Sequence, residues 1–262
     1  MEGSSENVYL LASNLIETSG TDDFIPALLS LINSATLCES VFVLHFHKHC
    51  RPSILVSPES TLLTEKIMDE YLNGFYMIDP FYNAFKAGLP TGLHFIKEVA
   101  PDDFFESTYY TGHYCNRDYD EAAFVIELDN ESQIQISLTI IETPATAATR
   151  ERLHAISPLV ISAYRKHWQS IENTQTASQQ ASAIIHEQIS SVFKNFGYGV
   201  LTERETELAI LIIRGYSLIA IAELLGIAHG TAKVHCKNLY SKLEINSKSE
   251  LFSLFLDQIS LT

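Results

Sequence analysis

The spacing of apolar residues changes several times along the first two thirds of the chain, and each change predicts a helix or a strand. Residues 22–32 carry phenylalanine, isoleucine and leucine at the intervals of a helix, whereas residues 40–47 alternate as a strand does. The same two patterns recur further along the chain. They predict helices over 61–76 and 147–169 and strands over 93–96, 122–128 and 133–141.

The last two predicted strands flank Asp129 and Asn130, which suit the turn of a hairpin. In the second strand the apolar residues share one face, and Gln135, Ser137 and Thr139 share the other. We expect this polar face to contact solvent. The elements together predict a sheet with helices packed on it, an α/β sandwich of the kind that often encloses a small ligand.

Composition places a boundary after this region. Residues 170–183 are poor in large apolar side chains and rich in serine, threonine and glutamine, which indicates a linker or a weakly packed helix, and residues 184–196 regain a helical pattern. We therefore predict an α+β protein. Its parts are an N-terminal α/β sandwich over 1–170, a linker with a connecting helix over 171–200 and an all-α domain of four helices over 201–262.

Signals for the start and end of helices are dense in the last part of the chain. Thr202 and Glu205 have the spacing of a capping box, and Ser247 and Glu250 repeat it. Gly226 supplies a tight turn between two predicted helices. This order of signals predicts a helix-turn-helix.

Charge is distributed unevenly along the sequence. The 262 residues include 32 Asp and Glu against 17 Lys and Arg, a formal net charge of −15 at pH 7. This acidity excludes a protein that coats nucleic acid with its whole surface. Residues 201–262 nevertheless hold six of the basic residues and seven of the acidic ones, so the excess of acid belongs to the first 200 residues.

The predicted third helix of the last part has two distinct faces. Ala232, Cys236 and Leu239 recur at helical spacing and form a stripe that we expect to be buried. Lys233 and Lys237 fall on another face, and no acidic residue lies nearby in the sequence. Such a face suits the major groove of DNA, and the alternative is an ordinary solvated helix surface.

Residues 201–251 resemble the LuxR-type helix-turn-helix domain of bacterial transcription regulators along their whole length. The matching residues include Leu201, Thr202, Arg204, Glu205, Gly215, Ile221, Ala222, Leu225, Gly226, Ile227, Thr231, Lys233, His235, Asn238, Tyr240, Lys242, Leu243 and Leu251. The resemblance implies that the third helix enters the major groove, with Lys233, Val234 and Lys237 facing bases. The residues expected to bind DNA are Thr202, Arg204, Thr231, Lys233, Val234, His235, Lys237, Asn238 and Lys242.

Two features of this region depart from the family pattern. Ala228 stands at the start of the third helix where the family has serine, so the helix lacks a capping side chain and about 0.5–2 kcal/mol of stabilisation with it. Residues 218–220, Leu-Ile-Ala, replace a polar run and enlarge the apolar surface of the second helix.

The fourth predicted helix has an apolar side of its own. The resemblance implies that this helix pairs two subunits, which matches a homodimer on a palindromic operator. The alternative is a core within one chain. The residues expected at the dimer contact are Leu251, Leu254 and Phe255.

Residues 71–90 resemble the tyrosine-rich segment of acyl-homoserine-lactone receptors of the LuxR family, with Tyr71, Tyr76, Asp79 and Pro80 matching. Those receptors place tryptophans around the lactone, whereas this chain has one tryptophan, Trp168. We therefore expect a GAF- or PAS-like sensor for another small molecule. The candidate ligand-binding residues are Tyr71, Tyr76, Asp79, Tyr82, His94, Phe104, Tyr109, Tyr110 and Tyr114.

The chemistry of these candidates leaves two interpretations open. Aromatic walls around one buried acid suit a cation or a polar head group. The same aromatic residues also suit an ordinary core, and Asp79 could simply begin a helix whose first residue is Pro80.

Other classes of protein are disfavoured. The cysteines are scattered, no secretion signal is visible at the N-terminus, and the apolar residues 208–228 carry Arg214 and Glu223, so we expect a cytoplasmic protein with no membrane association. No cofactor and no enzymatic activity are expected, because the spacings of a phosphate-binding or nucleophile loop are missing.

The sequence thus predicts a homodimeric regulator that binds double-stranded DNA and a small-molecule effector. One alternative is an orphan regulator whose N-terminal domain only binds proteins or dimerises. Another is a metal-assisted hydrolase built on His45, His47, His49 and Cys50, where alternate strand residues could supply two imidazoles.

Overall fold

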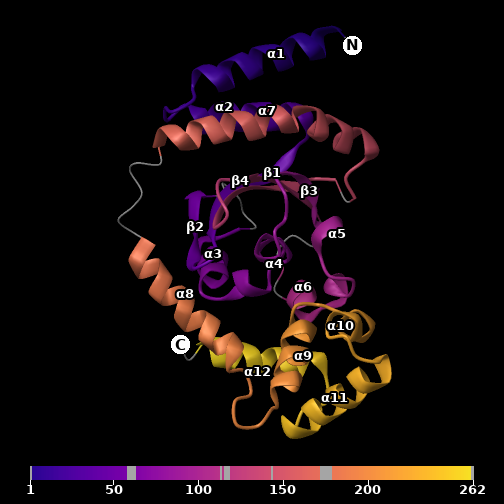
Figure 1. Cartoon of the computed structure of the whole chain (residues 1–262). Coiled ribbons are helices and arrows are strands. Elements are labelled where there is room, and N and C mark those ends of the chain that lie inside the picture. Colours follow the sequence, from indigo (N-terminus) through magenta and orange to yellow (C-terminus); the bar gives the residue numbers. More distant parts are fainter. Residues whose placement is uncertain are drawn as a thin grey trace. The chain divides into compact units, whose positions relative to one another are not determined.

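The computed structural model describes residues 2–57, 63–112, 114, 119–142, 144–171 and 179–260. The chain forms two compact units (Figure 1). The first comprises residues 1–64, 85–98 and 118–183, and the second comprises residues 65–84, 99–117 and 184–262. Two segments from the first 170 residues thus belong to the unit that contains the C-terminal helices. The predicted division at residues 170 and 200 stays a prediction, and residues 172–178 of the predicted linker lie outside the described residues.

A five-stranded antiparallel sheet forms the centre of the first unit, with the strand order β2-β1-β5-β4-β3. The central strand β5 pairs with β1 on one side and β4 on the other, so that Ile136 lies opposite both Val43 and Phe124. The strands are β1 (Cys38–His47), β2 (Cys50–Val56), β3 (Gly92–Phe95), β4 (Asp120–Glu127) and β5 (Ser132–Ile140). The predicted strands are confirmed. The sequence did not predict β2, because Arg51, Pro52 and Ser53 interrupt its apolar pattern.

Three helices pack against one face of this sheet (Figure 1). They are α1 (Glu2–Glu17), α2 (Phe24–Ala35) and α7 (Ala147–Ile171). Leu28 of α2 and Leu153 of α7 are fully buried in the same apolar core as Ile134 and Ile136 of the sheet. This arrangement confirms the predicted sheet with helices packed on it.

The opposite face of β5 corrects one expectation. Gln133, Gln135, Ser137 and Thr139 are all buried, so the prediction of a solvated face was wrong. Gln135 Nε2 donates a hydrogen bond to Ser137 Oγ over 2.8 Å. Gln133 Nε2 and Gln135 Oε1 have no hydrogen-bond partner among the described residues. Strand periodicity shows which side chains share a face, but it does not show whether another layer covers that face.

The second unit consists of helices. Residues 61–76 were predicted as one helix, but the described part forms two elements separated at Asn73 and Gly74. Its helices are α3 (Glu65–Leu72), η1 (Phe75–Ile78), η2 (Phe104–Glu106), α6 (Thr108–Gly112), α8 (Gln179–Lys194), α9 (Glu203–Ile213), α10 (Leu218–Leu224), α11 (His229–Lys242) and α12 (Lys248–Ser260). Two short helices, α4 (Pro80–Lys86) and α5 (Ile96–Val99), cross the boundary between the two units in the sequence. Within the described chain, no helix is both long and apolar enough to span a bilayer.

Candidate nucleic-acid interface and aromatic cluster

Helices α9, α10 and α11 form the predicted helix-turn-helix, and local signals fix where each begins. Thr202 caps α9 in a full capping box, in which its backbone N–H donates to Glu205 Oε2 over 2.9 Å and its hydroxyl accepts from the Glu205 N–H. Ser217 caps α10 by accepting from the Ala220 N–H over 3.2 Å. Gly215 and Gly226 adopt positive φ angles of 92° and 64° in the two connecting turns, which glycine tolerates without strain.

Helix α11 is anchored through one side. Ala232 and Leu239 are fully buried, whereas Cys236 of the predicted stripe is only half-buried. Ala228 has the extended dihedral angles of an N-cap residue but makes no side-chain cap, as the sequence predicted. The helix therefore holds its position through apolar packing rather than through a capped N-terminus.

The other side of α11 is open to solvent and basic. Lys233 and Lys237 are exposed, and Val234 between them is 57% exposed. Neither lysine has an ion-pair partner among the described residues. Both lysines also line an open groove of about 540 Å³ that includes Tyr240. Unpaired lysines on an exposed helix can approach phosphates and base edges without first breaking an intramolecular contact.

Three other residues expected to bind DNA have partners within the domain. Lys242 Nζ lies 2.6 Å from Glu205 Oε2, and Arg204 pairs with Glu207 at 2.7 Å. Burial opposes ionisation of Glu205, but the hydrogen bonds from Lys242 and Thr202 outweigh it and lower the pKa of this carboxyl group. Thr231, Asn238 and the half-buried His235 lie on α11 itself. Their DNA contacts stay predictions.

The residues expected at a dimer contact lie on α12. Leu251 and Phe255 are fully buried inside the second unit, where the Phe255 ring lies 4.6 Å from that of Phe193. These two side chains cannot contact another subunit without leaving that core. Leu254 is 37% exposed and is the member of the set that can reach another molecule. Dimerisation through α12 stays a prediction.

Eight of the nine candidate ligand-binding residues belong to the second unit. Tyr76 and Tyr82 are buried with ring centroids 4.9 Å apart, and Phe75 lies 5.6 Å from Tyr109. The ring of Phe104 contacts those of three tyrosines, namely Tyr109, Tyr110 and Tyr114. The ninth candidate, His94, belongs to the first unit, where its Nε2 hydrogen-bonds the Pro90 carbonyl oxygen over 2.9 Å.

Asp79 is a half-buried acid at the start of α4. Its Oδ1 accepts hydrogen bonds from the backbone N–H groups of Phe81 and Tyr82 over 2.6 Å and 3.2 Å. Burial raises the pKa of Asp79 to about 6, while these two amides and a hydrogen bond with the Tyr71 side chain act in the opposite direction. Asp79 therefore begins a helix at Pro80, which was one of the two interpretations left open by the sequence.

Two polar residues near this cluster were not anticipated. His186 of α8 lies with Nδ1 2.9 Å from the Tyr76 hydroxyl, and its Nε2 lies 3.2 Å from Ser190 Oγ. Arg214, at the C-terminus of α9, interacts electrostatically with Tyr82, and its Nε has no hydrogen-bond partner among the described residues. Both come from elements more than 100 positions away in the sequence, so no local pattern could reveal them.

The histidines around the turn between β1 and β2 are engaged locally. His49 Nε2 lies 3.1 Å from a Glu131 carboxylate oxygen, and His47 Nδ1 accepts from the His49 N–H. The ring of His45 packs against Trp168, with 4.9 Å between centroids. In the parts of the chain that are described, no three histidine, cysteine or acidic side chains are grouped so that they could hold a metal ion.

An exposed basic helix on a helix-turn-helix defines a DNA-binding regulator of transcription, and comparisons with known proteins agree. Residues 199–255 match the family model of bacterial regulatory proteins, luxR family. A protein of Aeromonas salmonicida, named as an HTH-type transcriptional regulator in the exeN 3' region, is 30% identical over 185 residues, which cover 69% of this chain and 94% of that protein. The chain belongs to the luxR family of regulators, whose members are DNA-binding proteins rather than enzymes.

Two further similarities cover parts of the chain. The response regulator protein VraR of Staphylococcus aureus is 43% identical over 53 residues, which are 20% of this chain and 25% of that protein. The crystal structure of the LBD domain of VqsR from Pseudomonas aeruginosa covers 62% of this chain and 96% of that chain, with 22% identity and a TM-score of 0.54. The similarity to the VqsR domain shows a shared fold.

Proposed function

We propose that this regulator senses a small molecule through residues of its first 170 positions and that the bound molecule changes the affinity of α11 for operator DNA. The observation that carries the DNA-binding part is the exposed side of α11, where Lys233, Val234 and Lys237 are open to solvent and the helix itself contains no acidic residue. We assign base contacts to these three residues and phosphate contacts to Thr231, His235 and Lys242. The protein would act in the cytoplasm as a homodimer on a palindromic operator.

Two observations support a ligand. Gln133 Nε2 and Gln135 Oε1 are buried and have no hydrogen-bond partner in the part of the chain that the structure describes, whereas buried polar groups in folded proteins nearly always have one. The half-buried carboxyl group of Asp79 is the other observation, because it lies among tyrosines whose rings suit a cationic or polar head group. The similarity of fold to the LBD domain of VqsR agrees with this assignment.

The test uses the full chain, because segments 65–84 and 99–117 belong to the same unit as the C-terminal helices. Thermal unfolding is measured against panels of amines, amino acids, lactones and aromatic metabolites. A ligand that binds the native state raises the melting temperature in a saturable way, and DNA affinity is then measured with that ligand present and absent.

Asp79→Asn serves as the matched variant, because it keeps a capping side chain but removes the charge. For a cationic ligand we expect this variant to lose most of the thermal shift. A folded protein that shows no shift with any class of compound would contradict ligand sensing and favour the orphan regulator with a protein-interaction domain.

A further inference from the structure

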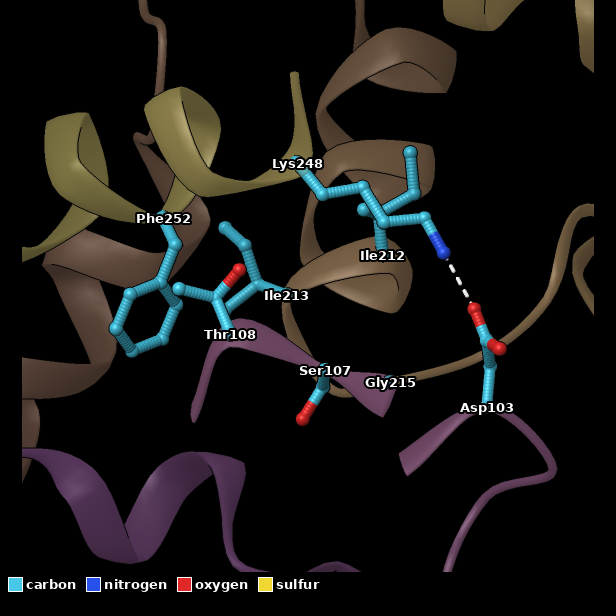
Figure 2. A pocket seen from close by; sticks show the side chains of 8 residues that line it. All are labelled: Asp103, Ser107, Thr108, Ile212, Ile213, Gly215, Lys248 and Phe252. Atoms are coloured by element: carbon cyan, nitrogen blue, oxygen red, sulfur yellow. Dashed lines mark hydrogen bonds and ion pairs between the residues drawn. The ribbon is translucent and has the colours of Figure 1, made fainter. Parts of the chain in front are cut away.

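Two adjacent acidic residues of the second unit, Asp102 and Asp103, contact the C-terminal helical region at three points. Asp102 Oδ1 accepts a hydrogen bond over 3.0 Å from the backbone N–H of Ser217, the N-cap residue of α10. The Asp103 N–H donates to the Gly215 carbonyl oxygen over 3.0 Å. The Asp103 carboxylate forms an ion pair with Lys248 at the start of α12 (Figure 2).

The segment that follows these acids packs closely against the same helices. A Cβ atom at Gly215 would lie 2.7 Å from the Phe104 Cα, so only glycine fits at this point of contact. The rings of Tyr109 and Phe252 lie 6.4 Å apart, and the Thr108 hydroxyl lies 3.3 Å from that of Ser249. The space between the two surfaces is about 10 Å³, which holds one water at most. It is therefore a closed contact rather than a ligand site.

The contact occupies hydrogen-bonding and charged groups of the kinds that bind DNA phosphates. In helix-turn-helix complexes the helix that precedes the recognition helix crosses the DNA backbone, and here that helix is α10, whose N-cap is Ser217. Backbone N–H groups and lysines are common partners of phosphates. Asp102 already accepts from the Ser217 N–H, and Asp103 already pairs with Lys248. Glu106, three residues later, adds a third negative charge. Phosphates and these carboxylates would repel each other.

We propose that Asp102 and Asp103 form an intramolecular clasp that competes with DNA phosphates for the start of α10 and for Lys248, and so weakens DNA binding. Helix α11 stays exposed while the clasp is closed, since Lys233 and Lys237 are open to solvent. The clasp thus opposes the approach of the backbone and leaves base recognition unaffected. This inference goes beyond ligand sensing and does not depend on it.

The test is the double variant Asp102→Asn, Asp103→Asn in the full chain. Binding to a fluorescein-labelled duplex of mixed sequence is measured by anisotropy over a range of salt concentrations. We expect the dissociation constant to fall about three- to tenfold at low salt, in line with the modest energies of exposed charge contacts. The gain should shrink as salt rises.

The matched control is Asp22→Asn, Asp23→Asn, which removes the same charge from an exposed adjacent pair in the first unit. An equal gain in this control would show a general effect of net charge and overturn the clasp, as would unchanged or weaker binding by the clasp variant. If the double variant unfolds, the single variant Asp103→Asn keeps the Asp102 contact with Ser217 and should show part of the gain. Its failure to bind more tightly would equally overturn the proposal.

Discussion

The hydroxyl of Tyr76 lies 2.9 Å from Nδ1 of His186, and both side chains are buried. This hydrogen bond joins the tyrosine-rich segment to α8, the helix that precedes the helix-turn-helix in the chain. A buried hydrogen bond of this kind stabilises the unit, and here it connects a candidate ligand-binding residue to α8.

Tyr76→Phe should destabilise the protein, because it removes the buried hydrogen bond between the Tyr76 hydroxyl and His186 Nδ1. We expect a loss of about 1–3 kcal/mol in the free energy of unfolding, measured by urea denaturation. Tyr198→Phe is the matched control, since the Tyr198 side chain is 87% exposed and belongs to the same unit. Equal stability of both variants would show that the contact with His186 contributes nothing.

Ala228→Ser should stabilise the protein by supplying the missing cap of α11. The backbone at Ala228 already has φ −66° and ψ 144°, which suits a capping serine, and the expected gain is about 0.5–2 kcal/mol. The reverse change, Ser217→Ala, should cost a similar amount at α10. A melting temperature that does not rise in Ala228→Ser would contradict the assignment of residue 228 as the cap.

Lys233→Gln and Lys237→Gln should each weaken binding to a selected operator by about 1–3 kcal/mol without unfolding the protein. The measurement compares the operator with a duplex of unrelated sequence. Lys66→Gln, on an exposed side of α3, controls for loss of a positive charge. If a variant loses the same affinity for both duplexes, the lysine contacts phosphate rather than bases.

The stability of the chain should depend on pH through His45. Burial and the neighbouring His47 lower the pKa of His45 from 6.5 to about 4. The unfolded chain therefore takes up a proton on this residue below pH 6.5, whereas the folded chain does so only near pH 4. This difference makes the His45 contribution to stability fall as the pH drops from about 6.5 to 4.

His45→Gln should remove that contribution and flatten the dependence of unfolding free energy on pH, measured by urea denaturation at several pH values. Asp79 supplies a contrast, because its raised pKa makes its contribution decrease as pH rises from about 4 to 6. Asp79→Asn should accordingly steepen the same dependence that His45→Gln flattens. Parallel curves for the two variants would refute the assignment of both groups.

The elements that the sequence predicted well are those fixed by local chemistry. The capping box of Thr202 and Glu205 needs only one helical turn, and the structure contains it as predicted. The alternation in residues 133–141 likewise gave the strand β5, because strand periodicity is a property of neighbouring residues.

The predictions that failed or stayed open depend on distant parts of the chain. Alternation could not show that Gln135 and Ser137 are covered. The partners of Tyr76 and Asp103 are His186 and Lys248, which lie 110 and 145 positions away. Spacing along the sequence carries no information about such pairs, so these contacts had to come from the three-dimensional structure.

The discontinuous second unit also has a consequence for how this protein is made. Residues 65–84 and 99–117 leave the ribosome long before α9 and α12, the helices that share their unit. Chains generally fold from the N-terminus during synthesis, so the first unit can form its sheet while Phe104 and Tyr109 still lack Gly215 and Phe252. These two aromatic-rich segments therefore stay unpacked after the sheet has formed, until the C-terminal helices have been synthesised. Any pause in translation before residue 252 prolongs the time for which they are exposed to chaperones and to aggregation.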